Sequence, residues 1–120
     1  MGKIKILYID DEEMNLELFT YNFSDNYDVI TGSSGEQGLE CLEEFPDIRI
    51  VISDMRMPNM TGLEFIRKAK SIYTDKKYYI LTGYDITQEI KEALESKLIH
   101  NYFRKPFNIT EIEQTIKEVT

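Results

Sequence analysis

The stretch VISDMRMPNMTG, residues 51–62, runs from an apolar segment through Asp54 to a turn at Met57–Pro58. Its first residues are β-branched and continuous rather than alternating, which is typical of a strand buried on both faces. A carboxylate at the end of such a strand is unusual, because a buried charge needs a partner. The same arrangement occurs in ILYIDDEE, residues 6–13, where an apolar run ends on Asp10 and Asp11.

Working outward from these two stretches, apolar runs alternate with segments of helical periodicity along the whole chain. The runs predict strands over Ile4–Ile9, Tyr27–Thr31, Ile48–Ser53, Tyr78–Thr82 and Ile99–Arg104. After each run, apolar residues recur three or four positions apart, which predicts five helices. Five β-α units predict an α/β fold with a parallel sheet and helices on both faces.

Helix starts are marked by polar pairs with the spacing of a capping box, in which a Ser, Thr, Asp or Asn precedes a Glu or Gln by three residues. Four such pairs fall where the alternation places a helix start: Ser34 with Gln37, Thr61 with Glu64, Asp85 with Gln88, and Asn108 with Glu111. One match is weak, but four at the expected places support the alternation.

Length and composition narrow the class of protein. A chain of 120 residues has room for one domain, which we expect to span residues 1–120. The net charge of −8 argues against direct binding to nucleic acid or to anionic lipid. With one cysteine and one histidine, the chain offers neither an internal disulfide nor a Cys/His zinc site. The N-terminal segment resembles neither a signal peptide nor a membrane span, so we expect a cytoplasmic protein.

Polar side chains stand at the ends of four of the predicted strands. The first strand ends at Asp10 and Asp11, the third at Asp54, the fourth at Thr82 and the fifth at Lys105. In parallel sheets of this kind, ligands bind beyond the carboxyl ends of the strands. The sequence therefore predicts that three carboxylates, a hydroxyl and an ammonium group meet at one edge of the sheet.

Three adjacent carboxylates repel one another unless a cation lies among them. Oxygen ligands of this type suit Mg²⁺, and the backbone carbonyl of Arg56 offers a further oxygen. Such a site is suited to phosphoryl transfer, which depends mainly on positioning and charge neutralisation. Asp54 is the best candidate for the nucleophile, because it stands alone on a central strand and leaves Asp10 and Asp11 to the metal. Thr82 and Lys105 would contact the phosphoryl oxygens.

The segments ILYIDDEE, VISDMRMPNMTG, YYILTGYD and YFRKPF occur in the order found in the receiver domain of response regulators, and together they span the chain. The sequence as a whole resembles this family of two-component signalling proteins. The resemblance implies a flavodoxin-like fold with strand order 2-1-3-4-5, and a phosphoacceptor rather than an enzyme. The partner would be a sensor histidine kinase or a phosphotransfer protein.

The resemblance also implies roles for individual residues. Asp54 would be the phosphoacceptor, with Mg²⁺ held by Asp10, Asp11, Asp54 and the carbonyl of Arg56. Thr82 and Tyr102 would change conformation on phosphorylation, and the Lys105–Pro106 bond would be cis. The readout face would comprise the fourth helix, the fifth strand and the fifth helix, which leaves open a phosphorylation-dependent homodimer. The downstream effector is not indicated.

Two bulky residues are expected to set the lifetime of the phosphoryl group. Arg56 lies two residues after the phosphoacceptor, and Tyr84 lies two residues after Thr82. Both would flank the path of the attacking water.

Two other functions compete with this interpretation. A phosphatase of the haloacid-dehalogenase type also uses an aspartate at a strand end, but it carries a second Asp two residues on, where this chain has Arg56. A protein-interaction module that never uses its phosphoryl site would have the same sequence pattern. Binding of a partner that is unaffected by Asp54→Asn would favour the interaction module.

Overall fold

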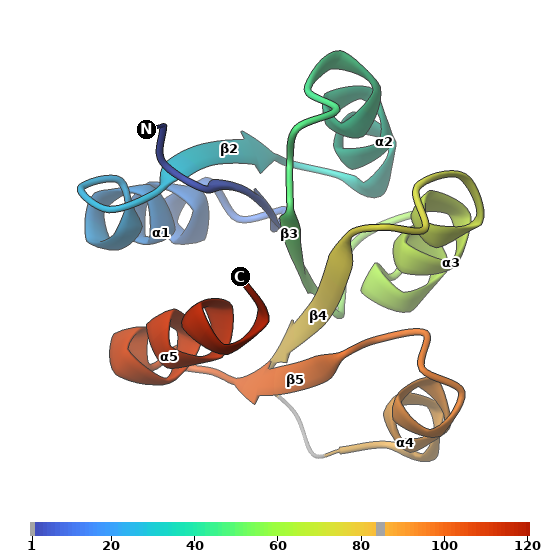
Figure 1. The fold of residues 1–120 in the computed structure, drawn as a ribbon. Helices are drawn as coiled ribbons and strands as arrows, with labels where there is room; N and C mark the ends of the chain where they lie inside the picture. Colours follow the sequence, from blue (N-terminus) through green and yellow to red (C-terminus); the bar gives the residue numbers. More distant parts are fainter. Residues whose placement is uncertain (1, 84–85) are drawn as a thin grey trace.

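In the part of the chain that the structure describes, five parallel strands alternate with five helices, and Figure 1 shows their arrangement. The computed structural model describes residues 2–83 and 86–120. The strands are β1 (Lys5–Ile9), β2 (Asp28–Gly32), β3 (Ile50–Asp54), β4 (Lys77–Thr82) and β5 (Asn101–Arg104). The helices are α1 (Glu13–Phe23), α2 (Gly35–Glu44), α3 (Gly62–Ile72), α4 (Gln88–Glu95) and α5 (Ile109–Val119).

The strand order is β2-β1-β3-β4-β5, which confirms the predicted flavodoxin-like fold. Helices α1 and α5 cover one face of the sheet, and α2, α3 and α4 cover the other (Figure 1). Every residue of β3 is buried, because this strand lies at the centre of the sheet and is covered on both faces. The two apolar cores therefore fix β3 on both sides and place its last residue, Asp54, at the carboxyl edge.

Each face of the sheet has its own core. Residues of β1 alternate between them: Leu7 and Ile9 pack toward α2, α3 and α4, whereas Ile6 and Tyr8 pack toward α1 and α5. The second core is rich in aromatic rings, with Tyr8 stacked on Phe19 at a centroid distance of 4.3 Å. This alternation is the two-residue periodicity of a strand with both faces covered.

The predicted helix starts are confirmed at three positions and wrong at one. Thr61 and Glu64 form a complete capping box, and the side chains of Ser34 and Asn108 each accept a hydrogen bond from the backbone N–H three residues later. Helix α4 is capped by Thr87, whose hydroxyl accepts a hydrogen bond from the Ile90 N–H, and not by Asp85. Asp85 itself lies outside the described residues.

The strand boundaries differ from the prediction by one or two residues at most places. The difference matters most at β5, whose predicted first residue is Ile99 and whose observed first residue is Asn101. The N–H groups of Leu98 and Ile99 both donate to the carbonyl of Ala93, so they close the end of α4 rather than join the sheet. Ile99 is nevertheless buried, as part of the core that the sheet forms with α2, α3 and α4.

Candidate functional site

Asp10 is the most firmly held carboxylate at the carboxyl edge of the sheet. It follows β1, is fully buried, and its N–H donates to the carbonyl of Gly32 at the end of β2. Its Oδ2 accepts hydrogen bonds from the Tyr8 hydroxyl at 2.7 Å and from Asn15 Nδ2 at 3.1 Å. The Glu12 N–H donates to Oδ1 at 3.0 Å. Asp11, in contrast, is exposed.

Asp54 is the last residue of β3 and is 7% exposed. Burial raises the pKa of its carboxyl to about 6, and the nearby charges of Asp10 and Asp11 act in the same direction. The hydrogen bond and positive charge of Lys105 oppose this rise but do not cancel it. The carboxylate of Asp54 is therefore destabilised by its surroundings while no further cation is present.

Lys105 follows β5 and reaches across β4 toward the acidic residues. Its Nζ lies 3.0 Å from Asp54 Oδ1 and 3.4 Å from Asp10 Oδ2. Its backbone is fixed by a hydrogen bond from its N–H to the carbonyl of Thr82 and is followed by a cis peptide bond to Pro106, the isomer that the resemblance implied. Burial lowers the pKa of Lys105, but the hydrogen bonds and charges of the two aspartates outweigh this effect and raise it, so the side chain is a stable cation.

The three aspartates lie close enough together to share one metal ion. Asp10, Asp11 and Asp54 each offer a carboxylate oxygen, and these atoms lie within 4.8 Å of one another. Lys105 supplies one positive charge against three carboxylates, which leaves negative charge to be neutralised. Oxygen donors with excess negative charge and one exposed member suit a hard, hydrated cation such as Mg²⁺. The donor set therefore fits the predicted metal.

The loop after β3 is held close to the site by a glycine. The Met55 N–H donates to the carbonyl of Leu81 on β4, and the Gly62 N–H donates to the carbonyl of Met55. A side chain at Gly62 would collide with the carbonyl oxygen of Asp54, so only glycine lets α3 begin this close to the end of β3. These contacts keep the loop of residues 55–61 close to the carboxyl end of β3.

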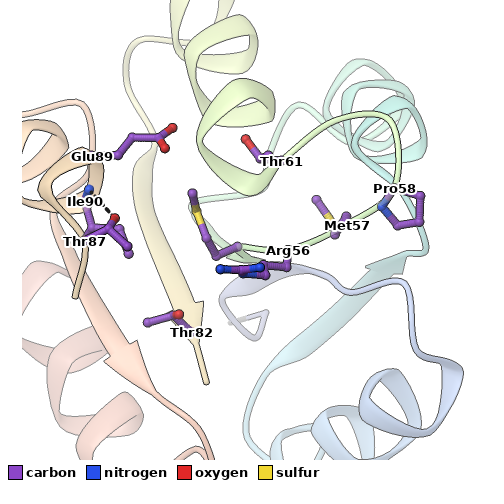
Figure 2. A pocket seen from close by; sticks show the side chains of 9 residues that line it. Arg56, Met57, Pro58, Thr61, Thr82, Thr87, Glu89 and Ile90 are labelled. Atoms are coloured by element: carbon purple, nitrogen blue, oxygen red, sulfur yellow. Dashed lines mark hydrogen bonds between the residues drawn. The ribbon is translucent and has the colours of Figure 1, made fainter. Parts of the chain in front are cut away.

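A pocket of about 510 Å³ opens beside this loop, between it and the start of α4 (Figure 2). Thr82 lines the pocket from the end of β4 and is almost fully buried. Arg56 lines it from the loop and is exposed. The other lining residues are Met55, Met57, Pro58, Thr61, Thr87, Glu89 and Ile90.

Of the two remaining residues predicted from the sequence, Tyr102 is described and Tyr84 is not. Tyr102 lies on β5, is half-buried and packs against the core formed with α2, α3 and α4. Its strand position pairs with Ile80 on β4, two residues before Thr82. Tyr84 lies outside the described residues.

Two contacts of the site were not predicted from the sequence, namely those of Tyr8 and Asn15 with Asp10. In the sequence, Tyr8 stands within an apolar strand, and because it lies two residues before Asp10 its side chain points to the same face of the sheet. Burial and the adjacent Asp10 hold the pKa of Tyr8 far above its ordinary value, so its hydroxyl keeps its proton and donates. The alternation of side chains along a strand is a signal that could have identified Tyr8. The contact of Asn15 with Asp10 depends on the orientation of α1 on the sheet, which the sequence does not show.

Fold and site together define an α/β protein with an acidic centre for a divalent cation beside a lysine. Comparison with known proteins gives the family: the family model described as "Response regulator receiver domain" matches residues 6–117. The chain belongs to this family, which confirms the resemblance, and its acidic triad is Asp10, Asp11 and Asp54. Receiver domains are phosphoacceptors of two-component signalling rather than enzymes in the ordinary sense, and they work with histidine kinases or phosphotransferases.

Individual relatives agree with the family. The chain is 32% identical to sporulation initiation phosphotransferase F of Bacillus subtilis over 95% of its own length and 91% of the relative's. It is 33% identical to the alkaline phosphatase synthesis transcriptional regulatory protein PhoP of the same species, over 96% of this chain. It spans only 48% of PhoP, and 23% of the hydrogenase transcriptional regulatory protein HoxA of Bradyrhizobium diazoefficiens.

Solved structures show the same fold. A response regulator receiver domain protein from Clostridium thermocellum superposes with a TM-score of 0.85 at 31% identity, covering 96% of this chain and 92% of that one. Within residues 2–83 and 86–120, none of the helices has the length and apolar character needed to cross a membrane.

Proposed function

We propose that this protein is a phosphorylation-controlled signalling switch that accepts a phosphoryl group on Asp54. The observation that carries the proposal is the position of this carboxylate. It lies at the end of the central strand, 3.0 Å from Lys105 Nζ and beside the oxygens of Asp10 and Asp11. This position supports the proposed roles of a nucleophile, a cation and a set of metal ligands at the edge where α/β proteins bind their ligands.

In the transfer step, a carboxylate oxygen of Asp54 attacks the phosphorus atom of the donor. A bond forms between this oxygen and phosphorus, and the bond from phosphorus to the donor breaks, with its electron pair remaining on the donor. The product is an aspartyl-phosphate. When bound, Mg²⁺ would be held by Asp10, Asp11, Asp54 and the carbonyl of Arg56, and would neutralise charge on the phosphoryl oxygens.

Two side chains of the chain itself would receive the new phosphoryl group. Lys105 already lies within ion-pair distance of Asp54, so it needs only a small displacement to contact a phosphoryl oxygen. Thr82 ends the neighbouring strand and would donate its hydroxyl to another oxygen. A hydrogen bond from the Lys105 N–H to the Thr82 carbonyl ties their backbones together, so both residues stand at the same edge of the sheet before the donor arrives.

The signal would travel from Thr82 to Tyr102. Movement of Thr82 toward the phosphoryl group would let the half-buried Tyr102 turn further inward, which changes the surface made by α4, β5 and α5. Exposed residues on or beside α4, among them Lys91, Glu95 and Lys97, would contact the effector. A nearly complete switch requires that phosphorylation favour the active packing by about 5 kcal/mol.

The phosphodonor would be a sensor histidine kinase or a phosphotransfer protein in the cytoplasm. The likeness to sporulation initiation phosphotransferase F supports a phosphorelay role, because this chain covers nearly all of that protein. We also propose that residues 1–120 form a single receiver domain, whose α4-β5-α5 face serves an effector or a phosphorylation-dependent homodimer, with no direct nucleic-acid or membrane contact.

The test is the intact mass of the protein after incubation with Mg²⁺ and acetyl phosphate. We expect the wild type to gain one phosphoryl group, and we expect EDTA and the Asp54→Asn substitution each to abolish the gain. Asp75→Asn is the matched control, since Asp75 is an exposed aspartate outside the acidic triad and its loss should change nothing. Wild-type protein that binds Mg²⁺ but gains no mass from acetyl phosphate or from any phosphohistidine donor would contradict the proposal and favour the interaction module.

A further inference from the structure

The two carboxylate oxygens of Asp10 have different surroundings. Oδ2 accepts hydrogen bonds from Tyr8 Oη at 2.7 Å, Asn15 Nδ2 at 3.1 Å and Lys105 Nζ at 3.4 Å. Among the described residues, Oδ1 accepts only the N–H of Glu12, at 3.0 Å. A carboxylate oxygen has about two lone pairs, so Oδ2 is saturated by protein donors while Oδ1 keeps one lone pair for another ligand.

The strongest of these donors is also the most rigid. The Tyr8 ring is fully buried and stacked on Phe19, with an angle of 14° between the ring planes. Its hydroxyl therefore has a fixed position, and a distance of 2.7 Å to an ionised oxygen is that of a strong hydrogen bond. Asn15 is carried by the first turn of α1 and approaches the same oxygen from a second element.

We propose that Tyr8 and Asn15 are positioning residues for the metal site: they hold Asp10 Oδ2 in the hydrogen-bond network of the protein, so that Oδ1 alone is presented to the cation. The inference rests on the proposed metal-dependent function. Asp11, which is exposed, is the adaptable ligand, and Asp10 is the fixed one.

This arrangement has a consequence for the choice of metal. Mg²⁺ requires nearly ideal octahedral geometry and takes one oxygen from each carboxylate, whereas Ca²⁺ accepts a carboxylate through one or both oxygens in flexible geometry. A carboxylate whose second oxygen is withheld by the protein therefore favours Mg²⁺. Removing the restraint on Oδ2 should weaken the binding of Mg²⁺ more than the binding of Ca²⁺.

The test is a calorimetric titration of the metal-free protein with Mg²⁺ and, separately, with Ca²⁺. In Tyr8→Phe, which keeps the stacked ring and removes only the hydroxyl, we expect the Kd for Mg²⁺ to rise about tenfold. The Kd for Ca²⁺ should rise less. The matched control is Tyr79→Phe: Tyr79 is equally buried in the same core, but among the described residues its hydroxyl has no hydrogen-bond partner.

A second variant keeps the test sound if Tyr8→Phe does not fold. Asn15→Ala removes the other neutral donor to Oδ2 from a partly exposed position, and its Kd for Mg²⁺ should rise in the same direction. An unchanged or lower Kd for Mg²⁺ in the folded variants, with normal binding by the wild type, would overturn the inference and leave the proposed function intact. Absence of Mg²⁺ binding by the wild type would overturn the metal site and the inference together.

Discussion

Lys105 Nζ lies 3.0 Å from Asp54 Oδ1 and so joins the ends of β5 and β3, two strands that are separated in the sheet by β4. The same ammonium group lies 3.4 Å from Asp10 Oδ2, at the end of β1. A single side chain therefore makes ion pairs with residues at the ends of two other strands. It also offsets part of the repulsion among the three carboxylates.

The first prediction concerns this lysine. Lys105→Met keeps much of the aliphatic stem and removes the charge, so the phosphoryl oxygens lose a preorganised cation. We expect phosphorylation by acetyl phosphate to slow by about 100-fold or more, which is the usual effect of removing one such group. The measurement is the time course of mass gain at saturating Mg²⁺. The matched control is Lys91→Met, because Lys91 is exposed. Lys76 is unsuitable as a control, because it is buried and donates to two backbone carbonyls. A rate equal to that of Lys91→Met would contradict the role of Lys105.

The second prediction follows from the raised pKa of Asp54. In the metal-free folded protein this pKa is about 6, above the ordinary value of 3.8, so the folded state holds the proton more tightly than the unfolded state. Stability contributed by the protonated group is therefore present at low pH and is lost as the pH rises from about 4 to about 6. The difference between these two pKa values corresponds to a change of about 3 kcal/mol at most in the free energy of unfolding.

The measurement is urea unfolding of the metal-free wild type and Asp54→Asn, at about pH 5 and about pH 8. We expect Asp54→Asn to be more stable than the wild type, and by a larger margin at the higher pH. Because other titrating groups are common to both proteins, the difference between them isolates Asp54. Adding Mg²⁺ at the higher pH should stabilise the wild type more than the variant. A margin that is constant with pH would mean that Asp54 titrates normally.

The strands were predictable from their apolar runs, and the meeting of Asp10, Asp54 and Lys105 from the rule that a parallel sheet places the carboxyl ends of all its strands at one edge. The strand order was implied by the family resemblance. The sequence could not show which donors reach Asp10. The bond from Tyr8 depends on side-chain direction within the strand, and that from Asn15 depends on how α1 packs.

Local signals misled the prediction where two residues competed for the same role. Both Asp85 and Thr87 are good capping residues, and the observed start of α4 selects Thr87. Ile99 is a β-branched residue of the type that favours strands, but its N–H donates to the carbonyl of Ala93 at the end of α4. The cap by Thr87 and the hydrogen bond of the Ile99 N–H both depend on where α4 begins and ends on the sheet, which periodicity alone does not specify.

The third prediction concerns the lifetime of the phosphoryl group. Arg56 is exposed on the loop that follows Asp54 and lines the same pocket as Thr82 (Figure 2). Its bulk should hinder water from reaching the phosphorus atom, and Tyr84 is predicted from the sequence to do the same. We expect Arg56→Asn with Tyr84→Ala to lose its phosphoryl group several-fold faster than the wild type. The measurement is the decay of the phosphorylated mass after the donor has been removed, with the exposed Arg67→Asn on α3 as control. Equal or slower decay in the double variant would refute the idea.

The last prediction concerns the end of α4. Lys97 has a φ of 64°, a left-handed conformation that is unfavourable for a residue with a side chain. Its N–H donates to the carbonyl of Leu94, and the next N–H, of Leu98, donates to the carbonyl of Ala93. These two bonds form a Schellman motif, in which the residue at the position of Lys97 is most often glycine.

Lys97→Gly should therefore stabilise the protein, by about 0.5–1 kcal/mol after allowing for the greater freedom of glycine in the unfolded chain. The measurement is the midpoint of urea unfolding. Lys97→Ala corrects for loss of the positive charge, and Lys91→Gly, in the interior of α4, should instead destabilise the protein by about 1 kcal/mol. A Lys97→Gly variant less stable than Lys97→Ala would show that backbone strain at this position is negligible.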